Sequence, residues 1–249
     1  CLAGSYALTA LNDTLDVNID RARFKKLRDF EAFDVGSLLI RHPLAQGIIS
    51  YRLALSWIIS LSLVSIVFTY LIKPWLIVLF LLVAILVTLY SYLNTISYWK
   101  LLVVAALVVL GSAAGWLAVA PAQSPAFPLF VLWIFCWEIG GRNIPNDFAD
   151  VDEDKELGLK TIPVVHGKEL ASKASFIFLL FAWAIGLAVV IAAALPLFFT
   201  VSSMIAGLLF LLLPGYRLLK NPEPLVAIKL FNYACLYPLT LLVLLLVSL

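Results

Sequence analysis

The stretch NDTLDVNID, residues 12–20, recurs 134 positions later as NDFADVDED, residues 146–154. Both copies contain an Asn-Asp pair followed by two aspartates at four-residue spacing. Because positions i, i+4 and i+8 share one face of a helix, each copy is expected to present three oxygen side chains together. These side chains are Asn12, Asp16 and Asp20 in the first copy and Asn146, Asp150 and Asp154 in the second.

The composition places this acidic repeat in a membrane protein. Of the 249 residues, 63% are hydrophobic and only 13% are charged, and the mean hydropathy is +1.06. These values exclude a soluble globular domain, in which apolar residues make up roughly half of the chain. The net charge of +2, without a basic tail, argues against a nucleic-acid partner.

Seven apolar segments are close to the length of about 20 residues that a helix needs to cross a bilayer. They run from Leu53 to Ile72, Pro74 to Leu93, Leu101 to Ala120, Phe127 to Ile144, Ala174 to Leu195, Leu197 to Leu213 and Leu225 to Leu249. The shorter apolar run from Cys1 to Leu11 precedes them, and we expect it to be the end of a truncated span. The alternative for an initial cysteine is a processed lipoprotein, whose lipid anchor would be redundant beside seven spans.

The positive charges predict the orientation of the chain. If the loop after the first partial span is cytoplasmic, every Lys and Arg except Lys73 falls on the inner side, as the positive-inside rule requires. Both copies of the acidic repeat then follow spans that end at this face. The sequence therefore predicts a multi-pass membrane protein with its active site on the cytoplasmic side.

The acidic repeat itself indicates cation binding. Aspartates stacked one helical turn apart repel each other unless a cation lies between them. Mg²⁺ combines one or two carboxylates with water and phosphate oxygens, so two facing clusters could hold a diphosphate through bridging Mg²⁺. Two other interpretations are solvated acidic loops and a membrane cation transporter with duplicated acidic sites. Transport sites lie near the bilayer midplane, whereas these motifs lie at the inner ends of spans.

Two further segments, RHPLAQGIIS at residues 41–50 and GLKTIPV at residues 158–164, accompany the paired motifs. With them, the chain resembles the UbiA superfamily of intramembrane prenyltransferases over essentially its whole length. The resemblance implies an all-α, polytopic transmembrane helical bundle, the nine-helix UbiA-like fold without helix one and part of helix two. It implies one N-terminally truncated transmembrane domain over residues 1–249, with the motifs in inner loops at 12–50 and 146–171.

The same resemblance implies Mg²⁺-dependent transfer of a prenyl group, with Mn²⁺ as an alternative ion. The donor would be a polyprenyl diphosphate, and the acceptor is often an aromatic ring, as in quinone biosynthesis; relatives also use haem, chlorophyllide and glycerol lipids. Asp16, Asp20, Asp150 and Asp154 would carry catalysis as metal ligands. Asn12, Asp13 and Asp147 are the other candidate metal ligands, and Asn12, Asn146, Arg41 and Lys160 are the candidates for binding substrate.

Polar residues within or beside the spans supply the remaining candidates. Tyr90 and Asn94 fall on one stripe at the inner end of a span and could line the acceptor pocket, although interfacial aromatic residues are common. Glu138 and Arg142 are spaced to pair along a helix, and a structural ion pair is favoured over direct substrate contact. Gly111 and Gly115 form a Gly-x-x-x-Gly pattern that predicts close helix packing.

Overall fold

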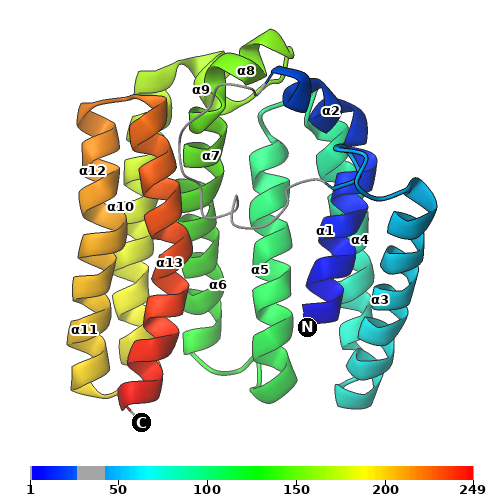
Figure 1. Cartoon of the computed structure of the whole chain (residues 1–249). Coiled ribbons are helices and arrows are strands. Elements are labelled where there is room, and N and C mark those ends of the chain that lie inside the picture. Colours follow the sequence, from blue (N-terminus) through cyan, green and yellow to red (C-terminus); the bar gives the residue numbers. More distant parts are fainter. Residues whose placement is uncertain (1, 27–42, 249) are drawn as a thin grey trace. The chain divides into compact units, whose positions relative to one another are not determined.

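The structure, a computed structural model, describes residues 2–26 and 43–248. Within these ranges every regular element is a helix (Figure 1), which confirms the predicted all-α class. The chain divides into two compact units, Cys1–Ala120 and Pro121–Leu249, and each is described here by itself. Each unit contains one copy of the acidic motif. The single domain over residues 1–249 stays a prediction.

Six helices among the described residues are long and apolar enough to cross a membrane. They are Tyr51–Ile72, Leu76–Leu93, Lys100–Val119, Lys168–Ala192, Leu197–Lys220 and Pro224–Ser248. Each of them overlaps one of the seven predicted spans. The remaining predicted span, Phe127 to Ile144, is helical throughout but consists of three pieces, none of which alone has the length that a bilayer requires.

Unit 1 holds the first motif beside a set of apolar helices. Its elements are α1 (Leu2–Leu15), α2 (Val17–Lys26), α3 (Tyr51–Ile72), α4 (Leu76–Leu93) and α5 (Lys100–Val119). Helix α1 packs against α3 and α4, and α4 also packs against α5 (Figure 1). Gly4 permits the approach of α1 to α3, because a Cβ atom there would lie 2.7 Å from Ser65 Oγ. By contrast, Cβ atoms at Gly111 and Gly115 would meet nothing within 4 Å, so the predicted close packing of these glycines is not seen within the described residues of unit 1.

Unit 2 holds the second motif at the end of a long helical run. Its elements are α6 (Ala126–Trp137), the π-helix η2 (Glu138–Asn143), α7 (Ile144–Ala149), α8 (Val151–Glu156), α9 (Ile162–His166), α10 (Lys168–Ala192), α11 (Leu197–Gly207), the π-helix η3 (Leu208–Leu212), α12 (Leu213–Lys220) and α13 (Pro224–Ser248). The pieces α6, η2 and α7 follow one another without a gap, and this run packs against α10 and α13. Its packing therefore fixes the point from which the second motif starts.

The π-helix η2 interrupts this run and ends three residues before the motif begins, and a neighbouring helix compensates for it. The Ile144 N–H donates to the Ile139 carbonyl five residues back, as a π-helix requires. In that register the donor to the Gly140 carbonyl would be residue 145, a proline, which has no N–H. The Ser175 hydroxyl of α10 donates to the Gly140 carbonyl instead, at 2.6 Å. A buried carbonyl that would otherwise lack a partner in an apolar medium is thus satisfied.

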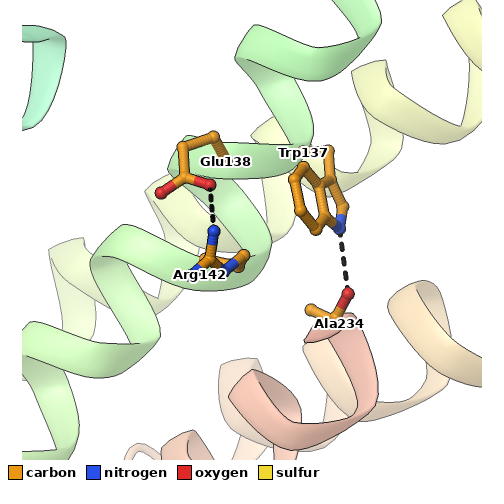
Figure 2. A network of polar contacts seen from close by, with 4 residues as sticks. All are labelled: Trp137, Glu138, Arg142 and Ala234. Carbon is orange, nitrogen blue, oxygen red and sulfur yellow. Dashed lines mark hydrogen bonds and ion pairs between the residues drawn. The ribbon is translucent and has the colours of Figure 1, made fainter. Parts of the chain in front are cut away.

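A second proline defect is compensated in the same way. Pro238 lies inside α13 and cannot donate to the Ala234 carbonyl four residues earlier. Trp137 Nε1 donates to this carbonyl at 3.1 Å, as Figure 2 shows. Beside this contact, Gly141 lets α13 approach closely, since a Cβ there would lie 2.9 Å from the Ala234 Cβ. The two bonds anchor the helical run on both α10 and α13 immediately before the second motif.

Candidate active site

The first motif occupies a helix that breaks at its central aspartate. Asn12 lies in the last turn of α1, Asp16 forms a bend between α1 and α2, and Asp20 lies in α2. The backbone N–H of Asp16 donates to the Asn12 carbonyl at 2.9 Å, and that of Asp20 donates to the Asp16 carbonyl at 3.0 Å. The helical spacing of the three side chains therefore continues through the break.

The second motif has the same construction at equivalent positions. Asn146 lies in α7, Asp150 stands between α7 and α8, and Asp154 lies in α8. The Asp150 N–H donates to the Asn146 carbonyl at 3.3 Å, and the Asp154 N–H donates to the Asp150 carbonyl at 2.8 Å. Both helices end one residue before the central aspartate and resume one residue after it. The repeat seen in the sequence is therefore also a structural repeat.

Four carboxylates of the two motifs are unusually well buried for acidic side chains. Asp16 and Asp20 are 6% exposed, Asp147 is 9% exposed and Asp154 is fully buried. Aspartates are rarely buried to this degree unless cations or hydrogen-bond donors balance their charge. This burial disfavours the interpretation of the motifs as solvated acidic loops.

One face of the helical run in unit 2 carries the polar residues of the second motif. Ile139, Ile144 and Phe148 are buried in unit 2, each less than 2% exposed. Asn146 and Asp150, on another face, are partly exposed. The run therefore buries its apolar face and leaves Asn146 and Asp150 partly exposed.

The donor atoms of the motifs fit a divalent metal that is shared with a phosphate ligand. Carboxylate and amide oxygens are the hard donors that Mg²⁺ takes. Among residues 2–26 and 43–248, however, no group of three or more His, Cys, Asp or Glu side chains lies close enough to hold a metal by itself. Mg²⁺ usually takes only one or two carboxylates and completes its shell with water and substrate phosphate. The motifs fit this mode of binding better than a cage made only of protein atoms.

Lys100 is a buried cation near the first motif that the sequence analysis did not identify as a site residue. Lys100, at the start of α5, is 3% exposed, and its Nζ donates to Asn94 Oδ1 at 2.8 Å. The same Nζ lies 5.9 Å from the centre of the Tyr90 ring. The Ser91 hydroxyl, next to Tyr90, donates to Asn12 Oδ1 at 3.3 Å. Tyr90 and Asn94, the two residues predicted to line the acceptor pocket, therefore both lie beside Lys100. Ser91 links this group to Asn12 of the first motif.

The sequence provided only a weak indication that Lys100 is a buried site residue. A lysine at the start of an apolar span is expected from topology alone, so its position does not distinguish a buried cation from an interfacial one. Only the fold shows that Asn94, at the end of α4, lies within hydrogen-bonding distance of it.

Of the two basic residues predicted to bind diphosphate, the structure describes only one. Arg41 lies outside the described residues. Lys160 is exposed in the loop between α8 and α9, after a turn in which Gly158 has φ +70°, a conformation that favours glycine. Its neighbour Thr161 is fully buried, and the Thr161 hydroxyl has no hydrogen-bond partner among the described residues. Sequence analysis did not identify this threonine.

The predicted pair of Glu138 and Arg142 is present within the π-helix. Arg142 Nη1 and Glu138 Oε2 are 2.9 Å apart, as Figure 2 shows. The guanidinium also lies 5.5 Å from the Trp137 ring and 5.9 Å from the Phe231 ring. The ion pair expected from the four-residue spacing is therefore confirmed.

Comparison with known proteins identifies the family. The model of the UbiA prenyltransferase family matches residues 1–236. The chain belongs to this family. A digeranylgeranylglyceryl phosphate synthase of Thermococcus sibiricus is 32% identical over 193 residues, covering 74% of this chain. The match spans 64% of the length of that relative.

Two solved structures share the fold. A UbiA homologue from Aeropyrum pernix K1 superposes with a TM-score of 0.69 at 21% identity, covering 97% of this chain and 85% of that one. A structure described as giving insights into the biosynthesis of digeranylgeranylglyceryl phosphate synthase in membranes also has a TM-score of 0.69, at 18% identity, covering 99% of this chain and 84% of that one. The UbiA-like fold that the motifs implied is confirmed. With six apolar helices, this UbiA family chain is an integral membrane protein.

Proposed function

We propose that this chain transfers a prenyl group from a polyprenyl diphosphate to an acceptor and releases diphosphate. The observation that carries the proposal is the structural repeat: two helix–aspartate–helix motifs with buried carboxylates, in a chain of the UbiA prenyltransferase family. Family membership also supports a transferase over the cation transporter considered from the sequence. The distribution of Lys and Arg supports a cytoplasmic position for the site.

Asp16, Asp20, Asp150 and Asp154 are the proposed ligands of Mg²⁺, or of Mn²⁺ in its place, with Asn12, Asp13, Asn146 and Asp147 beside them. Bound Mg²⁺ would stabilise the negative charge that develops on the leaving diphosphate. Lys100 and Lys160 are cations that could add to this stabilisation. Apolar helices around the motifs supply the water-poor surroundings that a cation-like allylic carbon requires.

The acceptor we favour is a glycerol phosphate that already carries one prenyl chain. The name of the Thermococcus sibiricus relative describes a product in which two geranylgeranyl groups are joined to glyceryl phosphate. Transfer to such an acceptor would join the prenyl carbon to a glycerol oxygen, with loss of the hydroxyl proton and of diphosphate. The aromatic acceptor predicted from the family resemblance remains the alternative.

An acceptor panel tests this assignment. Purified protein in lipid nanodiscs would receive labelled geranylgeranyl diphosphate, Mg²⁺ and either geranylgeranylglyceryl phosphate or 4-hydroxybenzoate. We expect labelled product with the glyceryl phosphate and at least about tenfold less with the aromatic acid. A site built to hydrogen-bond a polar group of one substrate strongly rejects a substrate that lacks this group. The reverse preference would show that the acceptor is aromatic. If neither acceptor gave a labelled product, the proposed prenyl transfer itself would be contradicted.

A further inference from the structure

Arg142 is a cation for which the mechanism above has no use. It lies one helical turn before Asn146, and so about 6 Å further into the span than the second motif. Its side chain is 34% exposed, whereas that of its partner Glu138 is only 4% exposed. The Arg142 side chain is therefore partly exposed, whereas the Glu138 carboxylate is buried.

The partners of Arg142 orient its side chain without satisfying it. Nη1 donates to the Glu138 carboxylate at 2.9 Å, and the Cys235 side chain is a second partner of the guanidinium. Arg142 Nε is buried and has no hydrogen-bond partner among the described residues. A guanidinium carries five N–H donors and binds carboxylates and phosphates in a fork geometry. Within a membrane span, a charged group with an unpaired donor indicates a functional site.

The position of Arg142 relative to the motif suggests what it binds. Arg142 shares the exposed face with Asn146 and Asp150, so a substrate at the motif lies within one helical turn of it. A metal-bound diphosphate and a phosphate on the acceptor would repel each other in this low-dielectric setting. The second anion therefore needs a cation of its own, separate from the metal.

We propose that Arg142 binds the phosphate group of the acceptor and that Glu138 holds the guanidinium in position for it. The inference rests on the proposed prenyl transfer and adds to it the residue that selects an anionic acceptor. The rings of Trp137 and Phe231 on either side of the guanidinium would restrict its movement further.

Kinetics of two variants test the proposal. Arg142→Lys keeps the charge and the ion pair but loses the fork. The double variant Glu138→Gln with Arg142→Gln removes both charges together, because leaving Glu138 unpaired in the interior would destabilise the fold. In each variant we expect the KM for geranylgeranylglyceryl phosphate to rise about tenfold or more, while the KM for geranylgeranyl diphosphate changes less than about twofold. The preference for this acceptor over phosphate-free geranylgeranylglycerol should fall by the same factor.

Three outcomes would overturn the proposal. They are an unchanged acceptor KM, an equal rise in the KM for the diphosphate, and an effect confined to 4-hydroxybenzoate. A binding measurement separates this proposal from the proposed reaction, because it needs no turnover. Glycerol 1-phosphate should bind the wild type in the presence of Mg²⁺ and diphosphate and should bind the double variant at least about tenfold more weakly. Equal binding to both proteins would contradict the role of Arg142 even if prenyl transfer were observed.

Discussion

Asp16→Asn and Asp150→Asn should each reduce prenyl transfer by more than about a hundredfold. Replacing outer-shell partners of metal ligands already costs about 10–100-fold, so removing a ligand charge should cost more. Asparagine keeps the size of aspartate, so the fold should survive, but it lacks the negative charge that attracts Mg²⁺. Initial rates of product formation in nanodiscs, with thermal unfolding measured in parallel, would check both expectations.

A matched control lies in the same helix as the second motif. Asp152 is in α8 between Asp150 and Asp154, and its side chain is 81% exposed. Asp152→Asn makes the same chemical change two residues away and should leave the rate within about twofold, as expected for a surface position. A normal rate in either motif variant would return that motif to the solvated-loop interpretation. A large loss in the control would show that charge near α8 matters in general.

Gly140→Ala should have the largest effect on stability. An alanine Cβ at this position would lie 2.8 Å from the Ser175 carbonyl oxygen and 2.9 Å from the Leu179 backbone nitrogen. Both atoms belong to the backbone of α10, so the two helices must separate, and the Ser175–Gly140 hydrogen bond is lost with them. Overpacking of this kind costs about 1–3 kcal/mol, and the unsatisfied carbonyl adds about the same again.

Gly115→Ala is the corresponding control in unit 1. It is also a glycine inside an apolar helix, but a Cβ there would meet nothing within 4 Å. Alanine is the better helix former by about 1 kcal/mol, so this variant should be as stable as the wild type or more stable. Thermal unfolding in one detergent compares the two. Equal melting temperatures would show that α10 can move away from η2 at little cost.

The apolar helices could be predicted from sequence because lipid requires long runs of apolar residues. Their ends were less certain. Helix α10 begins at Lys168, six residues before the predicted Ala174, because a hydropathy signal does not see the polar first turns of a helix that leaves the membrane. For the same reason α12 continues past Leu213 to Lys220.

The details of the site depended on contacts that a sequence does not record. The acidic pattern predicted a helical face, but not that each helix would break at Asp16 and Asp150. Aspartate disfavours helix interiors, but Asp13, Asp20, Asp147 and Asp154 all lie within helices, so residue type alone does not locate the breaks. The Gly140 carbonyl in the π-helix before the second motif accepts a hydrogen bond from Ser175, 35 residues further along the chain. Lys100 became a candidate only once Asn94 was found beside it.

Metal dependence tests the central claim most directly. The rate of transfer from geranylgeranyl diphosphate would be followed in excess EDTA and then during titration with Mg²⁺ or Mn²⁺. If the paired motifs hold the diphosphate through a divalent ion, product formation should stop in EDTA and return on addition of either metal. Full activity in excess EDTA would contradict the account.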